Sequence, residues 1–83
     1  DARVNHLHQT ALDMVHQIDP ALSLHDFRVV DGENRINLIF DVVVPYHYPV
    51  CDEKLEERID AALKQVDPRF FAVVNFDRSF LGE

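Results

Sequence analysis

The chain has 83 residues, of which 47% are hydrophobic, and its eight basic and fifteen acidic residues give a formal net charge of −7. This length indicates one small domain with a marginal core, so a second copy or a bound metal ion would add stability. The hydrophobic content excludes disorder, and the acidic charge argues against nucleic-acid binding, which needs a basic face.

The single cysteine, Cys51, excludes an internal disulfide and fits a reducing cytosol. No apolar run approaches the roughly 18 residues that a membrane-spanning helix needs. The first residue, Asp1, suggests that the sequence is a piece of a longer chain.

The first half of the chain predicts a helix followed by a strand and a turn. Apolar residues over 4–18 recur with the period of an amphipathic helix. Asp19-Pro20 ends this helix, because the residue before a proline avoids helical backbone. A strand is expected over 24–30. The segment 31–34 is typical of a turn, and Gly32 is able to take a positive φ there.

The second half predicts a strand, a helix and a third strand. The second strand runs over 35–44, and an aromatic loop bounded by prolines follows over 45–51. Asp52 is the expected N-cap of the second helix. Asp67-Pro68 ends that helix with the same dipeptide as the first, and the third strand covers 70–77.

This order of elements, αββαβ, predicts an α+β fold of the ferredoxin-like type with a three-stranded mixed sheet. We expect the strand over 24–30 to lie between the other two strands. Both helices are expected on one face of the sheet. The opposite face is then uncovered, which points to a partner surface.

Polar side chains of the kind that bind metal ions interrupt the apolar strand runs. His25 begins the first strand, Asp41 lies within the second, and Asp77 ends the third, two residues after Asn75. A carboxylate is disfavoured in a strand, and burying it without a partner is costly. The arrangement therefore raises the question of whether these groups meet.

The hairpin register decides whether His25 and Asp41 meet. Alternation places Asp41 on the face of its strand that points away from the core. A three-residue turn over 32–34 pairs His25 with Asp41, whereas a two-residue turn pairs it with Phe40. A bulge near the strand end also re-aims a side chain. The sequence leaves these alternatives open.

Each candidate ligand also has a plain structural interpretation. Asp41 suits a solvated face, His25 suits a hydrogen-bonded strand end, and His47 suits an exposed loop position. If the groups meet, imidazole with carboxylate favours Zn²⁺, Mn²⁺, Fe²⁺ or Co²⁺. The chain has no glycine-rich phosphate loop, HExxH or CxxC motif, so we expect neither an enzyme nor a small-molecule substrate.

The chain resembles the C-terminal cytosolic domain of cation diffusion facilitator transporters over nearly its whole length. The resemblance lies in His25-Asp26-Phe27-Arg28-Val29-Val30, a glycine turn, Asn37-Leu38-Ile39-Phe40-Asp41 with its valine run, an acidic helix, and Phe71-Ala72-Val73-Val74-Asn75-Phe76-Asp77-Arg78. It implies a metallochaperone-like fold and a homodimer. It also implies attachment to a membrane transport domain that exports divalent metal ions, which would place the chain at the cytoplasmic face of the cell membrane.

The resemblance also implies a set of metal ligands. The family positions fall on His25, Asp41, Asn75 and Asp77, and His47 is a further candidate from the loop. Asp41 and Asn75 stand where zinc-exporting relatives have histidines. This favours a weaker site or a harder ion, with Zn²⁺ expected first and Mn²⁺, Fe²⁺, Co²⁺ or Cd²⁺ as alternatives.

Two main functions remain after the sequence is considered, and a free-standing metallochaperone or small-ligand domain is a weaker third, with the missing CxxC motif counting against copper delivery. The first is a metal-sensing, dimerising regulatory domain of a cation exporter. The second is a structural dimerisation module without specific metal binding, in which Asp41 and Asp77 form ion pairs with Arg28, Arg35 or Arg78.

Overall fold

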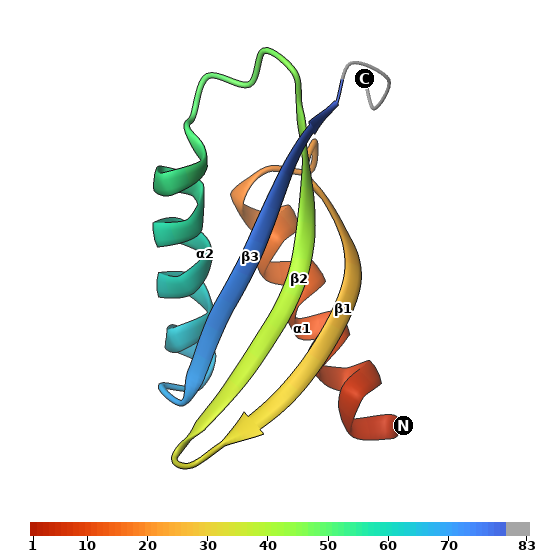
Figure 1. Ribbon diagram of the computed structural model, residues 1–83, viewed down its shortest axis with the longest axis vertical. Coiled ribbons are helices and arrows are strands. Elements are labelled where there is room, and N and C mark those ends of the chain that lie inside the picture. The colour runs from red at the N-terminus through yellow and green to blue at the C-terminus, as the bar shows by residue number, and fades with distance from the viewer. Residues whose placement is uncertain (80–83) are drawn as a thin grey trace.

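The computed structural model describes residues 1–79, and its elements follow the predicted order. They are α1 (Ala2–Ile18), β1 (Ser23–Gly32), β2 (Arg35–Pro45), α2 (Asp52–Val66) and β3 (Phe70–Ser79), as Figure 1 shows. The αββαβ arrangement with a three-stranded mixed sheet is therefore confirmed. The strands extend beyond their predicted bounds, because polar residues at their ends still pair across the sheet.

The predicted strand order is wrong, because β2 and not β1 lies in the centre of the sheet. β1 pairs with β2 in antiparallel orientation, and β3 pairs with β2 in parallel orientation. β2 carries apolar residues on both faces, which suits a strand with a neighbour on each side. β1 is the more exposed strand and carries several charged residues, which suits an edge.

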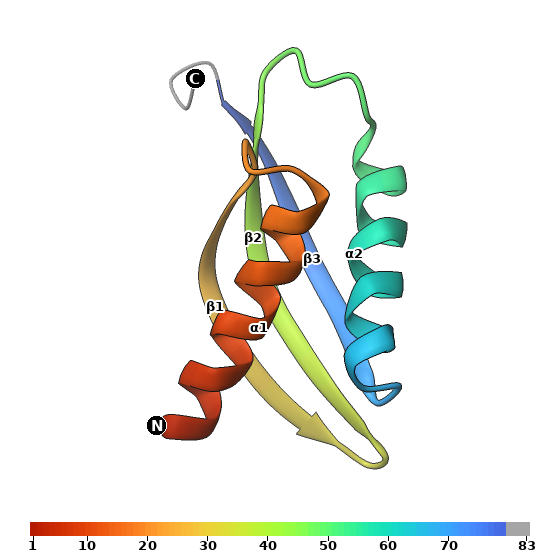
Figure 2. The same ribbon diagram turned by 180° about the vertical axis from the view of Figure 1, so that it is seen from behind.

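Both helices cover one face of the sheet, as predicted. α1 packs against β1 and α2 against β3, and the helices also contact each other. In Figure 1 the sheet lies in front of α1, and in Figure 2, the view from behind, α1 lies in front of the sheet. The buried core between these layers takes Leu7, Ala11 and Val15 from α1; Leu22 and Leu24; Ile36, Leu38, Phe40, Val42 and Val44 from β2; Leu55, Ile59 and Leu63 from α2; and Phe70.

The two Asp-Pro dipeptides form the same turn at both connections from helix to strand. The carboxylate of Asp19 accepts a hydrogen bond from the N–H of Ala21 at 2.8 Å, and that of Asp67 accepts one from the N–H of Arg69 at 2.9 Å. Each aspartate has extended backbone, with φ −163° at Asp19 and −152° at Asp67. In a side-chain turn of this kind the carboxylate satisfies the N–H two residues on, just after the proline that ends the helix.

The hairpin turn differs from the predicted one. Gly32 pairs with Arg35, so Glu33 and Asn34 alone form the turn. Asn34 and not Gly32 has the positive φ, at 60°. Glycine at position 32 leaves room for the side chain of Arg35, which would have to shift if the residue carried a Cβ. A Cβ there would lie 2.8 Å from Cγ of Arg35 across the hairpin.

The start of α2 also differs from the prediction. Cys51 is the N-cap and makes no capping hydrogen bond through its side chain. Asp52 is the first helical residue, and its Oδ1 accepts hydrogen bonds from Nε and Nη2 of Arg78 at 3.0 and 2.9 Å. Arg78 also donates to the carbonyl oxygens of Tyr48 and Val50. Asp52 therefore joins α2 to the end of β3 instead of capping the helix.

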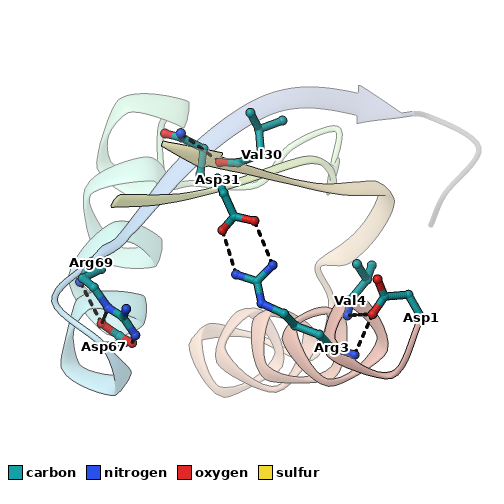
Figure 3. A network of polar contacts seen from close by, with 8 residues as sticks. Asp1, Arg3, Val4, Val30, Asp31, Asp67 and Arg69 are labelled. Carbon is teal, nitrogen blue, oxygen red and sulfur yellow. Dashed lines mark hydrogen bonds and ion pairs between the residues drawn. The ribbon is translucent and has the colours of Figure 1, made fainter. Parts of the chain in front are cut away.

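Two ionic contacts form at the opposite end of the molecule, one between elements and one within a turn. Arg3 of α1 donates two hydrogen bonds to the carboxylate of Asp31 of β1, at 2.7 and 2.9 Å (Figure 3). Arg69 contacts Asp67 at 2.8 Å in the turn after α2. Because Arg3, Asp31 and Arg69 are exposed, each pair contributes little to stability and serves mainly to fix orientation.

Candidate functional site

The face of the sheet that the helices leave uncovered, here called the open face, carries every predicted ligand that lies in a strand. The register and the alternation of the strands define its members. They are Ser23, His25, Arg28 and Val30 of β1; Asn37, Ile39, Asp41 and Val43 of β2; and Phe71, Val73, Asn75 and Asp77 of β3.

Three of the predicted ligands form one row across the open face. His25 lies opposite Asp41 in the antiparallel pairing, and Asp41 lies beside Asn75 in the parallel pairing. Asp77 is outside this row, because it pairs with Val43. It remains on the same face, one step along β3 from Asn75. The structure thus places a histidine, a carboxylate and an amide in register, with a second carboxylate diagonal to them.

A β-bulge at Asp26 makes this row possible. The register shifts between His25 and Arg28, and Asp26 has a φ of 55°. The extra residue in β1 reverses which positions face the helices. His25 and Arg28, separated by an odd number of positions, therefore both lie on the open face. The predicted pairing of His25 with Asp41 arises from this bulge and not from a three-residue turn.

The row is accessible and does not contain a complete metal site within one chain. Asp41 is half-buried, whereas His25, Asn75 and Asp77 are exposed. Within residues 1–79, no three His, Cys, Asp or Glu side chains are arranged to hold one metal ion. The imidazole of His25 and the carboxylate of Asp41 suit a borderline or hard divalent ion, but they are too few to hold it alone. One imidazole and one carboxylate lie side by side, and further ligands must come from Asp77, water or a second copy.

His47 lies outside the strands, in the connection between β2 and α2. Its side chain is exposed, and its ring meets that of Tyr46 edge to face, with 4.5 Å between the ring centroids. The structure therefore does not bring His47 into the row with His25 and Asp41.

The ion pairs proposed for a purely structural module do not form within the described part of the chain. Arg78 is held by Asp52, as described above. Arg35 places its guanidinium carbon 3.6 Å from the centroid of the Phe71 ring. Among the ion pairs of residues 1–79, none joins Asp41 or Asp77 to these arginines or to Arg28.

A polar and aromatic cluster at the start of β3 was not foreseen from the sequence. Nζ of Lys64 lies 4.1 Å from the centroid of the Phe71 ring, which Arg35 also contacts. Lys64 pairs with Asp60 at 2.6 Å, and Asp60 Oδ1 accepts a hydrogen bond from the N–H of Ala72. Asp60 is partly buried. Its spacing of four residues from Lys64 was the available signal.

The electrostatics of Asp60 follow from these contacts. Partial burial alone would raise the pKa of its carboxyl, but the hydrogen bonds from Lys64 and from the N–H of Ala72 outweigh it and lower the pKa. Asp60 therefore stays ionised at neutral pH as an acceptor fixed against the edge of β3.

Comparison with known proteins does not assign this chain to a family. No protein-family model, no curated protein and no solved structure matches it. Within the described residues, neither helix is long and apolar enough to cross a membrane.

Proposed function

We propose that this chain is the regulatory domain of a divalent metal cation exporter of the cation diffusion facilitator type. In this role it forms a homodimer through the open face and binds a divalent metal ion at the row of His25, Asp41 and Asn75. The observation that carries the proposal is the register of that row, which a bulge in β1 creates on the uncovered face.

The composition of the open face supports a second copy of the chain as its partner. Val30 and Val73 are each 49% exposed, and Ile39 pairs with Val73 and lies diagonal to Val30, so these three residues form an apolar centre on the face. Around this centre the face carries both signs of charge, with Arg28 on β1 and Asp77 on β3. A mixed surface of this kind is able to complement a copy of itself in an isologous dimer.

The polar row supports a metal ion at or near the dimer interface. One chain supplies an imidazole and a carboxylate side by side, which is fewer ligands than a closed site requires. Two copies with their open faces together supply twice this number. Binding that needs both copies would favour the dimer by mass action, and the metal concentration would then set the population of the dimer.

The assignment to an exporter rests on the resemblance of the sequence and not on a matching relative. The most specific element of that resemblance, His25-Asp26-Phe27-Arg28, coincides with the bulge that sets the row. The membrane transport domain and the position at the cytoplasmic face of the membrane belong to the same proposal.

Calorimetric titration with Zn²⁺, Mn²⁺ and Cd²⁺ tests the metal site, and sedimentation velocity with and without chelator tests the dimer. We expect His25→Ala and Asp41→Ala each to weaken binding of the preferred ion by at least about tenfold. His6→Ala is the matched control, because His6 is an exposed histidine on α1, far from the row in sequence and on the opposite layer. Equal affinity of all the variants would reject the site.

The second candidate function is a dimerisation module that binds no specific metal. The apolar centre of the open face favours it, because that centre provides a reason for dimerisation that does not involve a metal ion. A dimer that persists unchanged in chelator, and that Val73→Lys disrupts, would support this function over the first.

A further inference from the structure

Among residues 1–79, no other strand covers the backbone groups at the outer edge of β3. In this part of the chain β3 is an edge strand that pairs with β2 alone. In a parallel strand, alternate residues direct both their N–H and their C=O to the same side. Ala72 directs its N–H outward, because it donates to Oδ1 of Asp60 at 3.1 Å. By the same alternation, Val74 and Phe76 direct their backbone groups outward.

Two hollows lie along this edge, one at each end, and α2 lines both. A hollow of about 260 Å³ near the start of β3 is lined by Glu56, Glu57 and Asp60, with Phe71 and Arg35 on its other side. A second, of about 540 Å³, lies at the end of β3, where Glu53 of α2 and Arg78 line it. Figures 1 and 2 both show α2 running alongside β3. A segment lying along the edge would therefore contact both the strand and the helix.

The two edges of the sheet are not equivalent. The β1 edge is interrupted by the bulge at Asp26, and a bulge twists an edge away from further pairing. The β3 register continues without a shift from Phe70 to Ser79. Asp60 accepts a hydrogen bond from the N–H of Ala72 alone on this edge. The carbonyl of Ala72 and the backbone groups of Val74 and Phe76 therefore remain available for pairing with an added strand. β3 is therefore the edge suited to strand addition.

Charge decides which occupant fits. Of the three carboxylates that line the first hollow, Asp60 pairs with Lys64 and Glu57 pairs with Lys54, so among residues 1–79 only Glu56 has no ion pair there. Arg35, on the other side of the hollow, already contacts Phe71. Glu53 adds a carboxylate at the second hollow, where Arg78 is engaged by Asp52. A second copy docked edge to edge would bring its own Glu56 and Glu57 against these groups, and like charges oppose that arrangement.

We propose that the outer edge of β3 accepts a short basic peptide segment in extended conformation as a fourth strand. Backbone hydrogen bonds to Ala72, Val74 and Phe76 would supply the pairing, and the carboxylates of α2 would select lysine or arginine side chains. This surface adjoins the open face at Phe71. The proposal does not depend on metal binding or on the homodimer.

The test uses end-blocked peptides that alternate lysine with valine, and compares them with glutamate–valine peptides of the same length. Binding is followed by fluorescence anisotropy, and amide hydrogen exchange is measured residue by residue. We expect the basic peptide to bind and the acidic one not to bind. We also expect the amides of Val74 and Phe76 to gain protection, because they become hydrogen-bonded. Methylating alternate peptide nitrogens should abolish binding, since strand pairing needs those N–H groups.

A matched pair of variants tests the charge argument. Glu56→Lys should weaken binding of the basic peptide by about fivefold or more, whereas Glu33→Lys, an equal charge change at the exposed hairpin turn, should leave it nearly unchanged. Equal effects of the two variants would reject selection by α2. Equal binding of the methylated peptide would reject strand addition. Protection of Val74 and Phe76 that grows with protein concentration, without peptide, would show a second copy as the occupant and overturn the proposal.

Discussion

His25 lies opposite Asp41 only because β1 contains one extra residue. Counting back from Gly32 opposite Arg35 without a shift would place His25 opposite Val42, a fully buried core position. The bulge instead places Leu24 opposite Val42 and moves the imidazole to the open face. The same shift thus places the apolar side chain of Leu24 in the core and the imidazole of His25 on the open face.

The bulge predicts a specific response to substitution at Asp26. A φ of 55° disfavours side chains branched at Cβ and suits glycine. Asp26→Val should therefore lower the free energy of unfolding by about 1–2 kcal/mol, whereas Asp26→Gly should change it by less than about 0.5 kcal/mol. Urea unfolding measures both. The same two substitutions at Asn34, where φ is 60°, provide a control away from the row. Equal stability of both Asp26 variants would contradict the bulge.

The fold and the candidate site were predictable to different extents. The apolar periods of the helices and the Asp-Pro dipeptides correctly predicted five elements in order. The central position of β2 was missed, although its apolar residues on both faces were visible in the sequence. The bulge at Asp26 was not predictable in the same way, because aspartate takes a positive φ only where surrounding pairing requires it. The backbone conformation of Asp26 therefore determines on which face of the sheet His25 lies.

Asn75→His tests whether the row binds metal. Asn75 neighbours Asp41 across the parallel pairing and is exposed, so a histidine there adds a third strong ligand without changing the core. We expect affinity for Zn²⁺ to rise by at least about tenfold, or about 1.4 kcal/mol, in calorimetric titration. Gln65→His, at an exposed position on α2, is the control and should have little effect. An unchanged affinity in Asn75→His would argue against metal binding at this row.

Leu38 and Ile39 are neighbours in β2 that face opposite sides of the sheet. Leu38 has no exposed surface, whereas Ile39 lies on the open face and is half-buried. Leu38→Ala should cost about 3 kcal/mol of unfolding free energy, because it leaves a cavity in the core. Ile39→Ala should cost the monomer only about 1 kcal/mol. It should, however, weaken the homodimer, measured by sedimentation. A dimer unaffected by Ile39→Ala would indicate that the open face is not the interface.

The contact between Tyr48 and Asp19 predicts a pH dependence of stability. The hydroxyl of Tyr48 donates to Oδ2 of Asp19 at 2.7 Å, joining the loop before α2 to the end of α1. The N–H of Ala21 and the Tyr48 hydroxyl lower the pKa of Asp19, and the hydrogen bond to Asp19, with burial, raises the pKa of Tyr48. Stability from Asp19 is therefore present above its unfolded pKa of about 3.9 and is lost as pH falls through the lower folded value.

The tyrosine contributes at the other end of the pH range. Its folded pKa is raised, so its contribution is complete below the unfolded pKa of about 10 and is lost as pH rises through the folded value. Tyr48→Phe should thus lower the urea midpoint between about pH 4 and pH 10 and reduce the loss of stability at the alkaline end. If the midpoint of Tyr48→Phe differs from wild type equally at pH 7 and pH 11, the hydrogen bond to Asp19 is not the cause.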